Sequence, residues 1–213
     1  EKGFKEDEPI IMYLGKFLDT KGVGEVLLGF PSVLDKAPKA RLLLVGFGGY
    51  REHMEGMLAA MEEGDFEALM AYGAAGNFVD PCCGRDVGLV KRLFRRITKE
   101  ERGRILITGM LQHSALSEIL PCASLVIVGS KASEAFGMVL VEAMAAGVLP
   151  LSNDHSGLTD VLDAVRTLAP ELCEVMTIKS RPGGKHGKAD GEYFLNQFPI
   201  KTLQALEYLY PQG

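Results

Sequence analysis

Short apolar segments alternate with longer helical patterns through most of this 213-residue chain. The apolar segments are four to six residues long and lie at 9–14, 41–45, 104–108, 125–128 and 148–152. Runs of this length and composition are typical of strands that both faces of a parallel sheet bury. Because helical patterns separate them, we predict a Rossmann-like α/β domain with a doubly wound parallel sheet.

The remaining segments complete this prediction for a single domain over residues 1–213. We expect helices at 23–36, 51–63, 66–75, 87–97, 113–120, 138–146, 156–164 and 200–210, and a short sixth strand at 176–178. Pro31 is an awkward interior residue that is expected to kink the first helix. The charged residues 1–8 are interpreted as a linker and the glycine-rich, basic segment 181–191 as a mobile loop. No internal repeat is visible.

Composition narrows the class of protein. The formal net charge of −5 gives no basic field for nucleic acid, and no apolar run reaches the roughly 18 residues of a membrane span. No signal peptide is visible, so we expect a cytoplasmic protein. The cysteines, Cys82, Cys83, Cys122 and Cys173, have no zinc-type spacing and are interpreted as free thiols. A metal or redox role for the adjacent pair Cys82 and Cys83 stays open.

Two glutamates bracket the start of the predicted helix 138–146. Glu142 is the one charged residue in that helix, so we expect the helix to be buried on nearly all sides and Glu142 to need a partner. Gly147 is expected to end the helix in a left-handed conformation. Gly137 allows close approach to the backbone, and the first helix amides form a potential anion site. Glu134, just before them, is expected to face neutral hydroxyl groups.

Glu134 and Glu142 have seven residues between them, with Ala135-Phe136-Gly137 inside and Ala-Met-Ala-Ala-Gly after Glu142. This pattern resembles the donor-binding motif of family-4 (group 1) glycosyltransferases, which have the GT-B fold. The resemblance covers residues 9–165. It implies that Glu134 contacts the donor sugar and Glu142 the nucleotide ribose. The amides that would hold the diphosphate lie at Phe136, Gly137, Met138 and Val139.

Two lysines follow the first strand. Gly15-Lys16 and Lys21 could neutralise a diphosphate, although lysines in such a loop are often simply solvated. The resemblance implies that both bind the donor phosphates and act in catalysis with Glu134. Lys16 stands where relatives usually have Arg, which preserves the charge but loses bidentate geometry.

Other strand-end loops have weaker signals. Gly46 begins a turn that is interpreted either as part of the cleft or as purely structural. The resemblance implies that Met110 and Leu111 meet the nucleotide base through backbone atoms. His113, next along the chain, is either a site residue or the start of a helix.

The loops at 129–131 and 153–158 depart from the family pattern. Ser130 matches the family's Pro-Ser position, with Gly129 replacing Pro, and Lys131 is an additional cation. The segment 153–158 replaces a common Gly-Gly-Leu turn. Within it, Ser156 is expected to cap the next helix, and His155 could reach the donor sugar.

The resemblance implies the C-terminal, donor-binding half of a retaining, metal-independent hexosyltransferase. Its substrate would be a nucleoside-diphosphate sugar, with no cofactor and no metal, and no Asp-x-Asp metal motif is present. The acceptor-binding N-terminal domain would lie outside these residues, so we expect this chain alone to transfer nothing. Donor sugar, base and acceptor stay open.

Two alternatives remain. One is a non-catalytic module that binds nucleotide sugars. The other is a dinucleotide-dependent oxidoreductase domain, against which Arg51 counts, because it occupies the third glycine position of the dinucleotide fingerprint that begins at Gly46.

Overall fold

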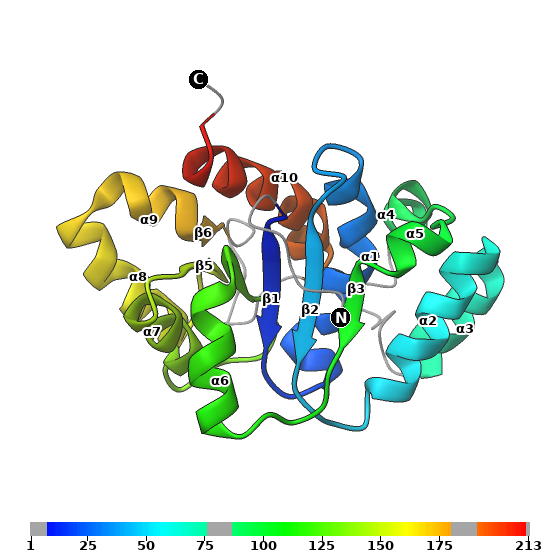
Figure 1. Ribbon diagram of the computed structural model, residues 1–213, viewed down its shortest axis with the longest axis horizontal. Coiled ribbons are helices and arrows are strands. Elements are labelled where there is room, and N and C mark those ends of the chain that lie inside the picture. Colours follow the sequence, from blue (N-terminus) through cyan, green and yellow to red (C-terminus); the bar gives the residue numbers. More distant parts are fainter. Residues whose placement is uncertain (1–7, 76–86, 180–190, 212–213) are drawn as a thin grey trace.

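A computed structural model describes residues 8–75, 87–179 and 191–211 of the chain. Its centre is a parallel sheet of six strands in the order β3-β2-β1-β4-β5-β6 (Figure 1). The strands are β1 (Ile10–Leu14), β2 (Arg41–Val45), β3 (Ile105–Ile107), β4 (Leu125–Val128), β5 (Leu149–Asn153) and β6 (Thr177–Ile178). The predicted Rossmann-like fold and all six predicted strands are confirmed.

Helices connect the strands in the pattern of a doubly wound sheet. They are α1 (Val23–Leu34), α2 (Arg51–Glu63), α3 (Phe66–Ala75), α4 (Val87–Leu93), α5 (Lys99–Arg102), α6 (His113–Ile119), α7 (Met138–Ala145), α8 (Gly157–Leu168), α9 (Pro170–Met176) and α10 (Gly191–Leu209). Two short 3-10 helices, η1 (Asp19–Lys21) and η2 (Leu120–Cys122), follow β1 and α6. None of the helices in the described ranges is long and apolar enough to cross a membrane.

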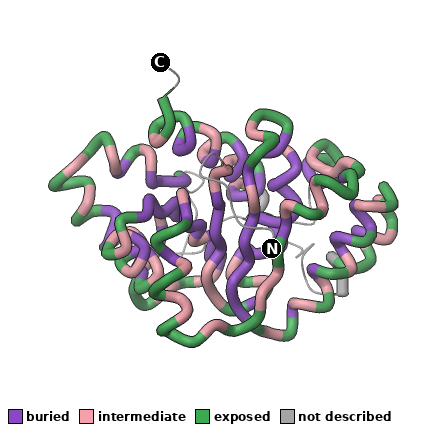
Figure 2. Tube along the Cα trace, viewed as in Figure 1, coloured by how far each residue is buried: buried purple, intermediate pink, exposed green. Residues whose placement is uncertain are grey.

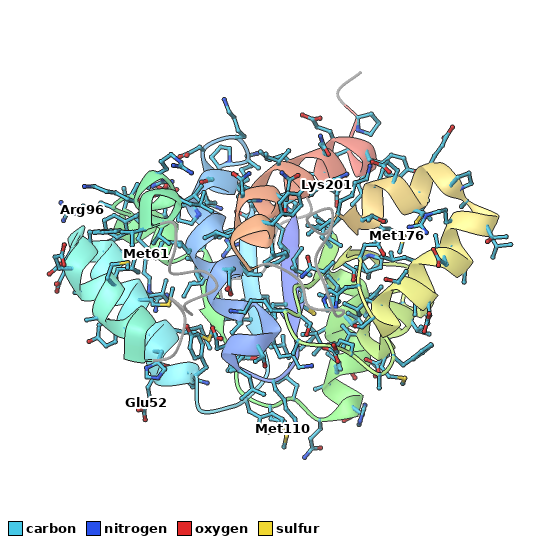
Figure 3. All side chains as sticks on the ribbon, turned by 180° about the vertical axis from the view of Figure 1, so that it is seen from behind. Glu52, Met61, Arg96, Met110, Met176 and Lys201 are labelled. Atoms are coloured by element: carbon cyan, nitrogen blue, oxygen red, sulfur yellow. The ribbon has the colours of Figure 1, made fainter. Side chains whose placement is uncertain are left out.

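Each face of the sheet has its own apolar core. Alternate β1 residues point to opposite faces, so Ile11 packs with α1 and α10, whereas Met12 packs toward α6 and α7. Figure 3, seen from behind, shows α1 and α10 lying over the sheet, and Figure 2 shows the buried strands surrounded by more exposed helices. The strands read as continuous apolar runs because both faces are covered.

Several helix boundaries differ from the prediction. α4 ends at Leu93 instead of continuing to 97, and the short helices α5 and α9 were not predicted. α10 begins at Gly191, nine residues before the predicted start, and contains Pro199. Phe194 and Phe198 explain its length: they lie one turn apart, are fully buried, and Phe198 packs where Gly29 of α1 has no side chain. The burial of these two side chains outweighs the cost of a proline inside the helix.

The prediction that α7 is buried on nearly all sides is wrong. Leu140 and Ala143 are its buried residues, while Met138 and Val141 are exposed. One face of this apolar helix therefore lies open, and Glu142, half-buried, is not in a low-dielectric core. The predicted helix stop is confirmed, because Gly147 adopts the left-handed conformation with φ 73°.

Some predictions fall outside the described residues. These concern the linker before residue 8, the loop 181–190, and Cys82 and Cys83. Cys122 and Cys173 are free thiols, as predicted.

Candidate functional site

A cavity of about 420 Å³ lies where the chain leaves β1 and β4. These two strands are neighbours, with β2 and β3 on one side of them and β5 and β6 on the other. The order of the strands therefore reverses between β1 and β4, and the cavity lies at the carboxyl ends of both. Open α/β sheets bind their ligands at such a switch point, and the volume is in the range of small-molecule sites.

The loop after β1 lines one side of the cavity with Gly15, Lys16, Leu18 and Lys21. Backbone hydrogen bonds to the end of β2 fix this loop, because Gly15 N donates to Val45 O at 3.0 Å. The Tyr13 hydroxyl donates to Lys16 O at 2.9 Å beneath it. Burial is the main cause that raises the pKa of the Tyr13 phenol, and the nearby carboxylates of Glu25 and Glu134 raise it further.

Gly22 makes the next turn possible. It adopts φ 72°, and a side chain there would collide with the carbonyl oxygen of Gly129, just after β4. The loops after β1 and β4 therefore touch through their backbones, and Lys21 is held at the cavity.

The start of α7 lines the opposite side through Phe136, Gly137, Met138 and Val139. The backbone N–H of Met138 donates to Phe136 O at 3.1 Å, whereas the N–H of Leu140 bonds back to Gly137 O. Phe136 and Met138 are 51% and 57% exposed, so the mouth of the cavity is apolar. Like the amides of any helix start, those of α7 favour an anion.

Lys21 and Glu134 meet across the cavity. The Lys21 ammonium donates directly to Glu134 Oε1, and the two side chains are 30% and 21% exposed. The carboxylate therefore lies against the cation that a phosphate would use, whereas the sequence suggested neutral hydroxyl groups as its neighbours. Lys16, which also lines the cavity, is exposed.

The turn after β5 holds the backbone of Glu134. Ser156 Oγ accepts from Glu134 N at 2.9 Å, and Gly157 N donates to Glu134 O at 2.9 Å. The predicted cap is wrong, because Ser156 makes no side-chain cap bond to α8. His155 is buried and bonds to Ser130 O at 2.7 Å, so it supports the loop after β4 rather than lining the cavity.

A buried ionic cluster behind η1 could not be identified from the sequence. Lys131 Nζ lies 2.6 Å from Glu25 Oε1 and 2.9 Å from Asp19 Oδ1, and Glu25 is 2% exposed. Burial opposes the charge on Lys131, but Glu25 and Asp19 outweigh it and raise the pKa of the ammonium. The backbone N–H of Lys131 also donates to Thr20 O at 2.8 Å. The cluster thus ties the helix that carries Lys21 to the loop after β4.

Four predicted site residues do not line the cavity: Gly46, Met110, Leu111 and Glu142. Gly46 packs against Gly15 O so closely that a side chain would collide, which supports its structural interpretation. Met110, labelled in Figure 3, is strongly exposed in the loop after β3, two strands from β1. Glu142 has no ion pair and no side-chain hydrogen bond to any described residue. The prediction that it needs a buried partner is therefore wrong. The open side of α7 leaves this carboxylate in contact with solvent.

Two other candidates have ordinary structural roles. Arg51, at the third position of the incomplete glycine fingerprint, begins α2, pairs with Glu55 at 2.9 Å and donates to Thr108 O. His113 is exposed and begins α6.

Comparisons with known proteins find similarity to glycosyltransferases. The family model described as glycosyl transferases group 1 matches residues 76–167. An uncharacterized glycosyltransferase of Methanocaldococcus jannaschii is 22% identical over 160 residues, which are 75% of this chain and 31% of that protein. The sulfoquinovosyl transferase of Arabidopsis thaliana is 32% identical over 91 residues, which are 39% of this chain and 17% of that protein.

A solved structure shares the fold. Anabaena HepE in complex with UDP superimposes with a TM-score of 0.51 at 16% identity, over 95% of this chain and 40% of that chain. The chain described above thus spans about a third or less of the length of the two curated relatives.

Proposed function

We propose that this chain is the part of a group 1 glycosyltransferase that binds a nucleoside-diphosphate sugar. The observation that carries the proposal is the cavity between β1 and β4, because it brings two lysines, the start of a helix and a glutamate together. The alternative of a non-catalytic module keeps the same ligand and differs only in what the rest of the protein does.

The diphosphate would lie between the β1 loop and α7. Lys16 and Lys21 supply positive charge from one side, and the start of α7, with the backbone amides of Gly137 and Val139, lines the other. Together they stabilise the charge that develops on a leaving diphosphate, which is the task a metal ion performs in other transferases. We therefore propose that binding and transfer need no metal.

The remaining parts of the donor extend to either side of the diphosphate. Glu134, beside Lys21, would accept hydrogen bonds from the sugar hydroxyls. The carboxylate of Glu142, one turn into α7 and without an ion pair to any described residue, would accept from the ribose. The base would then reach the exposed loop at Met110 and Leu111, outside the cavity itself.

Transfer itself is proposed for the longer protein. The bond between the sugar's anomeric carbon and the diphosphate breaks, and a bond to the acceptor oxygen forms on the same face of a hexosyl group. The acceptor's proton passes to the released nucleoside diphosphate. A second domain would supply the acceptor site, and the exposed side chains of Leu18, Phe136 and Met138 at the cavity mouth offer it an apolar surface.

Calorimetric titration with UDP, GDP and ADP tests the phosphate site. We expect Lys21→Ala to weaken binding of the preferred diphosphate by about 1–3 kcal/mol, the range of a charge-assisted hydrogen bond. The matched control Lys36→Ala, at an exposed position after α1, should bind like the wild type. EDTA should change nothing. Binding that EDTA abolishes and that is indifferent to Lys21 would contradict the proposed site.

A further inference from the structure

Ser156 has an unusual backbone conformation. Its φ of 49° and ψ of −142° make it the one non-glycine residue with positive φ among the described ranges. An L side chain is disfavoured in this region, and residues held there cost about 1–3 kcal/mol. The next residue, Gly157, is fixed as well, because a side chain there would collide with Ala135 O. Glycine would fit the position of Ser156 better, so the serine side chain itself requires an explanation.

The hydroxyl of Ser156 links the backbone of Glu134 to the side chain of His155. Its oxygen accepts from Glu134 N at 2.9 Å and lies 3.0 Å from His155 Nδ1. His155 Nε2 lies 2.7 Å from Ser130 O, which can only accept. Nε2 must therefore carry a proton, and in the neutral ring Nδ1 accepts the proton of the Ser156 hydroxyl. Two bonds therefore have fixed directions: Glu134 N–H donates to Ser156 Oγ, and His155 Nε2–H donates to Ser130 O.

We infer that Ser156 is a positioning residue that fixes Glu134 for recognition of the donor sugar. Its hydroxyl binds the N–H of Glu134 while the N–H of Gly157 binds the carbonyl of the same residue. With both backbone groups held, the carboxylate of Glu134 can move only through its own side-chain torsions. Ser156 does not itself line the cavity, so it acts through Glu134.

This inference rests on the proposed function and makes a narrower claim. The diphosphate is assigned to the lysines and α7, and the sugar to Glu134. Loss of the Ser156 hydroxyl should therefore reduce the preference for a nucleotide sugar over the corresponding diphosphate, with little change for the diphosphate. A serine that only stabilises the fold would leave this preference unchanged.

Two variants separate the role in recognition from the role in stability. Ser156→Gly removes the hydroxyl and also the backbone strain, whereas Ser156→Ala removes the hydroxyl and keeps the strain. We expect Ser156→Gly to melt at a higher temperature than Ser156→Ala. Both variants should nevertheless lose the same share of the preference, about 2- to 10-fold, the range of one hydrogen bond.

The probes are three matched pairs: UDP with UDP-glucose, GDP with GDP-mannose, and ADP with ADP-glucose. Affinities are measured by calorimetry for the pair that the wild type binds most tightly. Amide hydrogen exchange of Glu134 is followed in parallel, because its N–H should exchange faster in both variants. Lys21→Ala serves as a reference that weakens both members of a pair alike.

The outcomes separate the two claims. If the wild type binds none of the six probes, the proposed function fails, and this inference fails with it. If the wild type prefers a nucleotide sugar and both variants keep that preference, the inference alone is overturned. A loss of preference that follows the melting temperature, greater in Ser156→Ala than in Ser156→Gly, would also overturn it.

Discussion

Replacing Glu134 by glutamine should make a bare nucleoside diphosphate bind more tightly. In the structure, Lys21 and Glu134 form a direct ion pair inside the cavity. A phosphate that takes Lys21 must first separate this pair and then lie beside the carboxylate. Glutamine keeps the shape of the side chain but neither holds Lys21 as strongly nor repels the phosphate.

The magnitude follows from the exposure of the pair. Solvent-exposed ion pairs contribute about 0.2–1 kcal/mol, and Lys21 and Glu134, at 30% and 21% exposed, belong near the upper end. Relief of about 1 kcal/mol corresponds to roughly 5-fold tighter binding of the diphosphate. The nucleotide sugar should respond in the opposite direction, because the sugar loses its proposed carboxylate acceptor.

Calorimetry with UDP and UDP-glucose, or the matched pair that the wild type prefers, measures both effects. Salt offers a further check, because the gain for the diphosphate should shrink as ionic strength rises. Glu118→Gln is the matched control, since Glu118 is exposed on α6, away from the cavity. Diphosphate binding that weakens in Glu134→Gln would refute the reasoning, because the carboxylate would then assist the phosphate instead of competing with it.

Three further predictions address the proposed ribose contact, the loop after β1 and the buried cluster. Glu142→Gln should weaken diphosphate and nucleotide sugar alike by about 1–3 kcal/mol in calorimetry, and unequal losses would argue against a ribose contact. Gly22→Ala should lower the free energy of unfolding in urea by more than Gly147→Ala does. Both glycines have φ near 72°, but a side chain at Gly22 meets a backbone carbonyl and one at Gly147 meets nothing. Lys131→Met should cost about 3–5 kcal/mol of unfolding free energy because it strands the buried carboxylate of Glu25, and adding Glu25→Gln should recover much of it. No recovery would mean that the cluster contributes through packing alone.

The sheet could be predicted from the sequence because its signal is local. Each strand is a short run of apolar residues, and such a run reports burial on both faces without knowledge of any partner. The boundary of α10 shows where a local signal fails. The predicted helix began at residue 200, but Phe198 packs against Gly29, which lies 169 positions away in sequence, and this contact extends the helix toward its N-terminus.

Burial of α7 could not be predicted for a related reason. Periodicity reports that a residue is apolar, but it does not report what covers it. Met138 and Val141 have the sequence pattern of a core helix and are nevertheless exposed. The apolar pattern of α7 therefore predicts more burial than the described residues provide.

The site shows the same division between residue type and environment. The glutamates and lysines could be selected from the sequence because their positions resemble a family motif, and the structure places Lys16, Lys21 and Glu134 around one cavity. Their immediate partners come from far along the chain: Lys21 and Glu134 are 113 positions apart, and Lys131 and Glu25 are 106 apart. Ser156 is the clearest case, because its type and position suggested a helix cap, whereas its backbone conformation turns the hydroxyl toward Glu134. The strain of a backbone cannot be read from the type of the residue. Ser156, which we infer to position the sugar contact, could therefore be recognised only from the structure.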